Sequence, residues 1–325
     1  MAESSLSIGW SDLKAEVGFF IGYGRSSANW SAAMITEIES LVQSGIRLVY
    51  YPPAVSEQVN GYEWSWLRPT TTLDIYAAYS TGTVTVVAGV VTLASGTFPS
   101  WSASGEFTVS GVTYTVNTRD GDTQITLDDT SVAVAAGTSY SIAQVDYTLP
   151  DDFGRLVGML HYPTDEHRTS ISVVSVGRIL VLRASDKLSG APYYVAVRYK
   201  ASTGAGGQRQ EALFYPEPDE DWTLKYEYEA YSGALSDTYP YPLGGMQLAE
   251  LYIESCLAVA ENRINDTPGL HGEQYKRLLV DAITRDGRRG SQNFGQMGHK
   301  EDYAREFRRG WMGSIYEITY KGVEI

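Results

Sequence analysis

The alternation of apolar and polar residues predicts two amphipathic helices near the N-terminus. The first has four apolar residues at the spacing i, i+4, i+7 and i+8, namely Leu13, Val17, Phe20 and Ile21. Ser11 is its expected N-cap. The second has a similar apolar stripe, formed by Trp30, Met34, Ile38, Leu41 and Val42. We expect Gly45 to end this second helix, because glycine readily adopts the conformation that follows a helix C-terminus.

The pattern then changes to β-type residues. "IRLVYYPP" (46–53) predicts a short strand that Pro52 and Pro53 stop. From about residue 71, runs rich in Val, Thr and Tyr are separated by Gly, Asp and Ser, as in "TVTVVAGVVTLASGTFPSW" and "TSYSIAQVDYTLP". This spacing predicts consecutive antiparallel strands in a small sandwich or barrel. Asp120-Gly121 predicts a hairpin, because this dipeptide tolerates positive φ.

A second β region is predicted over about residues 151–231. We expect its strands in "SISVVSVGRILVLRAS", "APYYVAVRYK", "EALFYP" and "WTLKYEYEAY". In the last of these, four apolar residues alternate with polar ones, namely Trp222, Leu224, Tyr226 and Tyr228. This alternation predicts one buried and one exposed face.

The helical period returns after "YPYPLGG". "MQLAELYIESCLAVAEN" is apolar on nearly all sides, which indicates a helix with several neighbours. A narrower stripe predicts a second helix, with Tyr275, Leu278, Leu279, Ala282 and Ile283 on one face. The chain ends in the alternating segment "SIYEITYKGVEI", which has Tyr316, Ile318 and Tyr320 on one side. We interpret this end as an arm that pairs with another chain.

The order of these elements predicts an α+β fold. N- and C-terminal helices form a helical base over residues 1–70 and 243–286. A small sandwich or barrel is inserted over 71–148, a second antiparallel β region follows over 149–242, and an extended C-terminal arm covers 287–325. Helices and strands do not alternate, so a doubly wound nucleotide-binding fold is not expected.

Composition narrows the classes of function. The 325 residues include 25 Lys+Arg against 39 Asp+Glu, giving a formal net charge of -14. This acidity argues against a protein that grips nucleic acid by its phosphates. No run of about 18 apolar residues occurs, so no membrane span is expected. The 24 Tyr against 8 Phe fit either partly wet contacts between subunits or the preference of tyrosine for strands.

Asp151 and Asp152 are the first candidates for chemistry. Two neighbouring carboxylates could serve an enzyme or a metal site. However, adjacent residues on a strand point to opposite faces, and acids after Leu149-Pro150 are typical of a turn, where they cap the following backbone. We favour the structural interpretation.

Other candidate sites are weaker. "HYPTDEH" (161–167) has metal-ligating residue types but no common zinc spacing, so a charged surface loop is favoured. "GYGRSS" (22–27) lacks the strand and the third glycine of a phosphate loop, so a break between helices is favoured. The lone Cys256 fits a core residue. We therefore expect no catalytic residue, no cofactor and no metal.

A cluster of arginines lies near the C-terminus, at Arg285, Arg288, Arg289, Arg305, Arg308 and Arg309. Nucleic acid could bind there. Because acids including Asp286, Glu301 and Asp302 are interleaved, protein contact or solvation is the favoured interpretation.

Four stretches together resemble head-to-tail adaptor proteins of tailed bacteriophages, also called connector or head-completion proteins. They occur in the same order and cover most of residues 13–286: "LKAEVGFFIGYGRSSANWSAAMITEIESLVQSGIRLVYYPP", "YEWSWLRP", "VDYTLPDDFGRLVG" and "YPLGGMQLAELYIESCLAVAENRINDTPGLHGEQYKRLLVDAI". The stretch from "TVTVVAGVVTLASGTFPSW" to "SYSIAQ" is similar to a β insertion found in many of these proteins.

The resemblance implies a non-enzymatic virion protein of the neck. Such subunits form a ring, typically a dodecamer, under the portal vertex, assembled in the bacterial cytoplasm. The implied partners are the portal protein, a tail or neck protein (a stopper, nozzle or tail tube), copies of the chain itself, and double-stranded DNA that passes through the channel without specific binding.

The resemblance also implies roles for particular residues. Seven of them correspond to packing elements, namely Trp30, Tyr51, Pro52, Trp64, Trp66, Leu67 and Pro69. Residues 287–325 correspond to an arm that engages the portal, in which we expect the binding residues to be Arg308, Arg309, Trp311, Tyr316, Ile318 and Tyr320.

Two other functions stay open. One is a different neck or tail ring, such as a stopper or tail terminator, although those proteins are usually smaller and dominated by β-structure. The other is a tail-associated carbohydrate-binding or depolymerase domain, which the Tyr- and Trp-rich middle of the chain would suit. A depolymerase would need two carboxylates opposed across a cleft.

Overall fold

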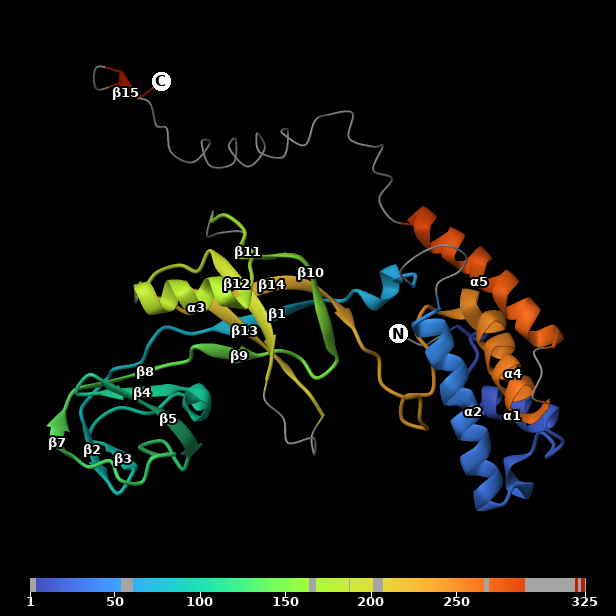
Figure 1. The fold of residues 1–325 in the computed structure, drawn as a ribbon, viewed down its shortest axis with the longest axis horizontal. Helices are drawn as coiled ribbons and strands as arrows, with labels where there is room; N and C mark the ends of the chain where they lie inside the picture. The colour runs from blue at the N-terminus through green and yellow to red at the C-terminus, as the bar shows by residue number, and fades with distance from the viewer. Residues whose placement is uncertain are drawn as a thin grey trace. The chain divides into compact units, whose positions relative to one another are not determined.

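The computed structural model describes residues 4–53, 61–163, 168–186, 188–200, 207–265 and 269–289, with the short strands 319–320 and 323–324. The chain divides into two units (Figure 1). The helical unit draws on Met1–Pro69 and Ala230–His299, and the β unit on Thr70–Glu229 and Lys300–Ile325. The fold is α+β, as predicted.

The N-terminal segment of the helical unit contains α1 (Trp10–Phe20), η1 (Ser27–Asn29) and α2 (Ala32–Tyr50). The predicted N-cap Ser11 is wrong, because α1 begins at Trp10 and the cap position is occupied by Gly9, two residues earlier. The Gly9 N–H donates to the Asp12 carboxylate at 3.0 Å. An acid in the first turn therefore accepts from a backbone N–H at the helix N-terminus that has no partner within the helix. In α2, the Ser31 hydroxyl accepts from the Met34 N–H and caps the helix.

Gly45 does not end α2, which continues to Tyr50, and the predicted strand over 46–53 is therefore wrong. Gly45 faces the second helical segment so closely that a Cβ atom there would lie 2.6 Å from the Cα of Cys256. The Ser255 hydroxyl donates to the Gly45 carbonyl oxygen. The glycine is thus needed for close helix packing and not for a C-cap.

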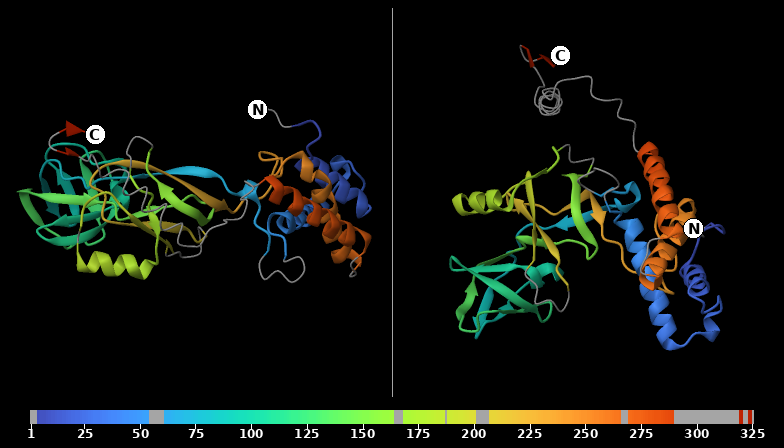
Figure 2. Two further views of the ribbon diagram at one scale, coloured as in Figure 1. Left: turned by 90° about the horizontal axis from the view of Figure 1, so that it is seen from above. Right: turned by 45° about the vertical axis from the view of Figure 1, so that its right-hand side comes forward.

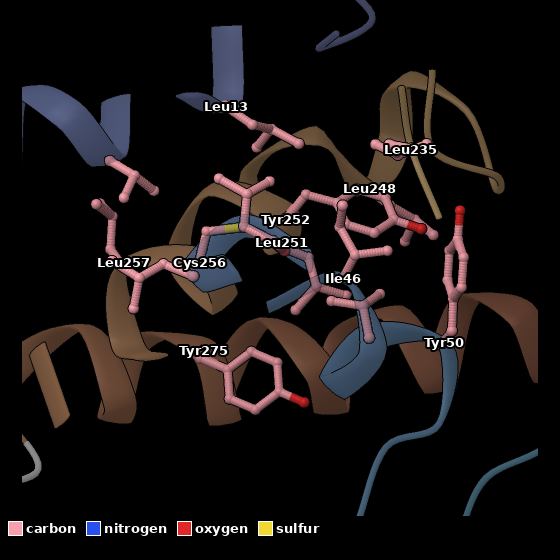
Figure 3. Close-up of a cluster of buried hydrophobic side chains, with 14 of the residues drawn as sticks. Leu13, Ile46, Tyr50, Leu235, Leu248, Leu251, Tyr252, Cys256, Leu257 and Tyr275 are labelled. Carbon is pink, nitrogen blue, oxygen red and sulfur yellow. The ribbon is translucent and has the colours of Figure 1, made fainter. Parts of the chain in front are cut away.

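The C-terminal segment of this unit contains η4 (Met246–Leu248), α4 (Ala249–Asn265) and α5 (Leu270–Arg289). Helix α5 continues past residue 286, the predicted boundary between the helical base and the arm, to Arg289. Helix α4 contacts α1, α2 and α5, which fits its apolar character on nearly all sides. Figure 3 shows the resulting core, where residues far apart in the sequence meet, including Leu13, Ile46, Leu251, Cys256 and Tyr275.

A curved seven-stranded sheet forms part of the β unit (Figures 1 and 2). Its strands are β2 (Val84–Val87), β3 (Val90–Leu93), β4 (Glu106–Val109), β5 (Val112–Arg119), β6 (Gln124–Leu127), β7 (Val134–Thr138) and β8 (Tyr140–Ala143), and η3 (Ser100–Ser104) lies between β3 and β4. The strand order is β7-β2-β3-β6-β5-β4-β8, with antiparallel pairing throughout. Phe98, Phe107 and Ile125 are fully buried in its core. The sequence predicted this antiparallel β insertion.

The predicted hairpin at Asp120-Gly121 joins β5 and β6, but Gly121 is not among the glycines with positive φ. Instead the Asp120 carboxylate accepts from the hydroxyls of Thr118 and Thr126, at 2.9 and 2.6 Å. Positive φ occurs at two other hairpins, where Ala88-Gly89 joins β2 to β3 and Ser110-Gly111 joins β4 to β5. The loop at 120–123 is therefore closed by these side-chain hydrogen bonds together with backbone N–H groups of Asp120 and Gly121, which donate to the Gln124 carbonyl.

Two further sheets lie in the β unit. The first has the order β1 (Thr70–Ile75), β14 (Trp222–Ala230) and β10 (Phe153–His161). The second has the order β11 (Ser172–Val173), β12 (Tyr194–Tyr199), β13 (Gln210–Tyr215) and β9 (Asp146–Thr148). The alternation predicted for β14 is confirmed, because Trp222, Leu224, Tyr226 and Tyr228 are buried while Thr223, Lys225 and Glu227 are exposed.

One predicted strand region is largely a helix. In "SISVVSVGRILVLRAS" only β11 is a strand, and α3 (Val176–Ser185) follows it. The Ser175 hydroxyl accepts from the Arg178 N–H and caps this helix. Ile179 is fully buried, and Leu182 lies three residues further on the same face and packs against the same cluster. This helical contact outweighs the strand preference of the flanking β-branched residues.

Candidate functional site

The segment before the β insertion is locked into the helical unit by aromatic side chains. In η2 (Ser65–Leu67) and the residue before it, the Trp64 and Trp66 rings stack at 5.3 Å. The Trp64 indole N–H donates to the Val49 carbonyl at 2.7 Å. A buried tryptophan with a satisfied N–H fixes the path of the chain between α2 and β1.

The carboxylate of Asp286 holds the same segment against α5. It accepts from the Tyr62 hydroxyl at 3.0 Å, the Ser65 N–H at 2.9 Å and the Ser65 hydroxyl at 2.5 Å. Asp286 is only 6% exposed, and its three donors compensate for this burial. Burial, together with the hydrogen bond to Asp286, raises the pKa of Tyr62 to about 12. No local pattern in the sequence points to this role, because Asp286 is one of several acids among arginines.

The cavity beside this cluster is small. It is lined by Trp66, Gly244, Leu248 and Arg285, among others, and its volume is about 20 Å³. This volume accommodates about one water molecule and is far below that of a small-molecule site. The cluster therefore serves to position the chain.

The seven residues matched to packing elements differ in burial. Trp30, Pro52, Trp64 and Leu67 are buried, and Trp66 is half-buried, whereas Tyr51 and Pro69 are exposed. The Tyr51 ring nevertheless contacts Tyr231, with the ring centroids 5.8 Å apart.

The connection between β14 and η4 exposes tyrosines at fixed positions. Tyr231, Tyr239 and Tyr241 are 55%, 73% and 48% exposed. Their backbone is tied to the helices, since the Trp10 N–H donates to the Pro240 carbonyl at 2.7 Å. Further along, the Tyr252 hydroxyl donates to the Leu243 carbonyl at 2.7 Å. We call residues 231–246 the tyrosine segment. Anchored, exposed tyrosines of this kind are typical of protein interfaces. The "YPYP" motif is the one sequence signal that could have identified it.

The arginine cluster is described only in part. Arg285 and Arg288 lie exposed on α5. The side chain of Arg289, together with Arg305, Arg308 and Arg309, lies outside the described residues.

The C-terminal arm also lies mostly outside the described residues, including Trp311, Tyr316 and Ile318. Tyr320 belongs to β15 (Thr319–Tyr320), which pairs antiparallel with β16 (Val323–Glu324). The described end therefore pairs with itself as a short hairpin, and pairing of the arm with another chain stays a prediction.

Asp151 and Asp152 have different partners. Asp151 pairs with Arg209 at 2.8 Å, and Asp152 accepts from the Tyr228 hydroxyl at 3.0 Å. The Phe153 N–H donates to the Pro150 carbonyl, which closes a turn at the predicted place. The two carboxylates stabilise this turn through the side chains of Arg209, which precedes β13, and Tyr228 on β14. Within the described residues neither carboxylate caps the following backbone, so that part of the prediction is wrong.

The remaining candidates have structural partners where they are described. His161 Nδ1 lies 2.8 Å from the Ser170 hydroxyl, and residues 164–167 of "HYPTDEH" fall outside the described part. The "GYGRSS" stretch joins α1 to α2, and the Trp30 indole N–H donates to the carbonyls of Tyr23 and Gly24. Burial raises the pKa of the Cys256 thiol. Among the described residues, no three His, Cys, Asp or Glu side chains are grouped so as to hold a metal ion.

A search for helices that could cross a membrane finds none within the described ranges. No protein-family model matches the chain, and no curated protein matches it.

Proposed function

We propose that the chain is the subunit of a virion neck ring that joins the portal vertex to the tail. The observation that carries this proposal is the anchored tyrosine segment on a helical unit built from both flanks of the β insertion. The resemblance of residues 13–286 to head-to-tail adaptors supports the same conclusion. In this role the helical unit forms the ring. Its partners are the portal protein and a tail or neck protein, and no catalytic step is required.

The charge of the chain supports passage of DNA through such a ring. With a formal net charge of -14, the subunit repels the phosphates of double-stranded DNA more than it attracts them. In this role DNA slides through the channel without a specific contact. The protein would be assembled in the bacterial cytoplasm and then reside in the virion neck.

The portal-binding role of the arm follows from the resemblance and is tested by truncation. Deleting residues 311–325 leaves all of α1, α2, α4 and α5 in place, so we expect a folded protein that no longer cosediments with the portal protein of the same virus. Undiminished cosedimentation would contradict the role of Trp311, Tyr316, Ile318 and Tyr320.

The tyrosine segment is tested separately. The double substitution Tyr239→Ala and Tyr241→Ala should weaken self-association, because large aromatic residues carry much of the binding energy of protein interfaces. Tyr199→Ala provides the matched control, since Tyr199 is 66% exposed and lies on β12. If both variants change the sedimentation profile equally, the tyrosine segment is not part of the interface between copies.

A further inference from the structure

Another cavity lies within the β unit, and its volume is about 160 Å³. A cavity of about 150 Å³ is large enough for a benzene-sized group, whereas drug-sized ligands occupy at least about 300 Å³. This cavity can therefore take one amino-acid side chain or a ligand of similar size. We call it the β-unit pocket, and its polar lining consists of Glu106, Arg183, Asp186, Tyr215 and Glu217.

Three carboxylates make the β-unit pocket acidic. They belong to Glu106 on β4, Asp186 at the C-cap of α3 and Glu217 shortly after β13. Asp186 and Glu217 form no ion pair within the part of the chain that the structure describes. The C-terminus of α3 adds partial negative charge, because the helix dipole is negative at that end. The electrostatics of the pocket therefore favour a cation as its occupant.

The one base in the described lining, Arg183, is engaged elsewhere. Its guanidinium pairs with the Asp146 carboxylate at 3.4 Å. It also donates to the carbonyls of Val145 and Phe214, at 2.8 and 2.9 Å. These partners compensate for its charge and tie the chain that follows β8 to α3. The acids that line the pocket therefore keep an excess of negative charge.

A buried hydroxyl group lines the same pocket. Tyr215 is only 5% exposed, and its ring packs with Ile179 and Leu213. Among the described residues its hydroxyl has no hydrogen-bond partner. Burial, together with Tyr193 and Asp186, raises the pKa of Tyr215, so the phenol stays protonated at neutral pH. The influence of Asp186 indicates that the hydroxyl end of the ring points towards the carboxylates. A buried hydroxyl without a partner is costly, and a ligand that donates to it would remove this cost.

The arrangement of the acceptors selects the kind of cation. No three acidic side chains of the described residues are grouped so as to hold a metal ion, so the carboxylates of the pocket do not converge on one point. A guanidinium group suits separated acceptors, because it presents five N–H donors in one plane. Val145 and Leu188 add apolar surface to the lining, and an aliphatic stem can pack against it.

We propose that the β-unit pocket binds a guanidinium group carried on an aliphatic stem. The carboxylates of Asp186 and Glu217 and the Tyr215 hydroxyl accept from its N–H groups, and Glu106 adds further negative charge. An arginine side chain of a partner protein and a free alkylguanidine such as agmatine share this chemistry. The inference goes beyond the proposed function and does not depend on it.

Isothermal titration calorimetry on the full chain tests the pocket with two probes, which are agmatine and a blocked tripeptide with a central arginine. The double variant Asp186→Asn and Glu217→Gln should bind at least about tenfold more weakly, because hydrogen bonds to charged groups are the strong ones. Tyr215→Phe removes only the hydroxyl and should weaken binding about threefold. Binding of the tripeptide assigns the pocket to a side chain of a partner protein, and binding of agmatine alone assigns it to a free alkylguanidine.

The matched control carries Asp128→Asn and Glu227→Gln, which remove two negative charges at exposed positions of the β unit outside the pocket. It should bind as the wild type does. Lys187→Ala is a second control, because Lys187 lies between two lining residues in the sequence. Removal of this positive charge should not weaken the binding of a cation. Circular dichroism checks that every variant is folded.

Several results would overturn the inference. They are the absence of binding of either probe to the wild type, equal affinities of the wild type and the double variant, an equal loss in the matched control, and weaker binding by Lys187→Ala. Displacement of the probe by Mg²⁺ at constant ionic strength would also overturn it and assign the pocket to a metal ion. The neck ring is tested by binding to the portal, so the failure of one proposal leaves the other standing.

Discussion

The helical unit and the seven-stranded sheet are held together over very different sequence distances. In the helical unit, Ser255 bonds to Gly45 across 210 residues, and Tyr62 bonds to Asp286 across 224. In the seven-stranded sheet, every buried core residue lies between Val84 and Ile142. The sheet can therefore form from consecutive hairpins, whereas the helical unit needs both flanks of the insertion to meet. Long-range contacts of this kind carry a larger loop-closure cost.

The largest expected effect is on the long-range contact at Gly45. Gly45→Leu would place side-chain atoms where Cys256 now lies, with its Sγ and backbone both within 3 Å of the new Cβ position. We expect the helical unit to lose about 5 kcal/mol of stability, since backbone has to move. Hydrogen exchange should show deprotection of α2 and α4 while β2 to β8 stay protected. Gly272→Ala on α5, where nothing lies within 4 Å, is the control and should not destabilise.

The converse experiment breaks the sheet and spares the helices. Phe107 is fully buried in the seven-stranded sheet, so Phe107→Ala should cost about 3–5 kcal/mol. Hydrogen exchange should then be faster in β4, β5 and β8 and unchanged in α1, α2, α4 and α5. Loss of protection in both regions together would show that they unfold as one cooperative unit.

A smaller effect is expected at Asp286. Asp286→Ala removes the acceptor for Tyr62 and Ser65, and we expect a loss of about 2–3 kcal/mol. Denaturant unfolding measures it, and exchange at the Ser65 amide localises it. Asp281→Ala, at an exposed position of the same helix, should change stability by less than about 0.5 kcal/mol. We call the hydrogen bonds of the Asp286 carboxylate to Tyr62 and Ser65 the Asp286 clamp. Similar losses of stability in the two variants would contradict it.

The clamp also predicts a dependence on alkaline pH. The pKa of Tyr62 is raised from 10.0 to about 12, so its contribution to stability is fully present below pH 10 and is lost as pH rises towards 12. In this window the free energy of unfolding should fall more steeply for the wild type than for Tyr62→Phe. Parallel pH curves for the two proteins would refute the coupling.

The smallest effect concerns the turn in the β unit. Asp151 pairs with Arg209 at the surface, with side chains 80% and 38% exposed. Asp151→Asn should therefore change the unfolding midpoint very little, by at most about 0.5 kcal/mol. A loss of several kcal/mol would mean that Asp151 has a structural role that its surface contact does not explain.

The comparison also explains which parts of the fold the sequence predicts. The strands of the insertion follow from local alternation and turn residues, and β14 alternates as expected. The prediction that Gly45 ends a helix is wrong because glycine is needed there for close contact with Cys256 on α4. A residue so distant in sequence does not contribute to the local pattern around Gly45. Helix α3 was missed because β-branched residues around Ser175 conceal the cap. The role of Asp286 depends on contacts with Tyr62 and Ser65, which are distant in sequence, so a local pattern cannot predict it.

The most direct test of the account is the native mass of the purified chain, alone and mixed with the portal protein of the same virus. A neck-ring subunit should form a complex with one copy of this chain for each portal subunit, which corresponds to twelve copies on a dodecameric portal. A chain that stays monomeric and ignores the portal would contradict the proposed function.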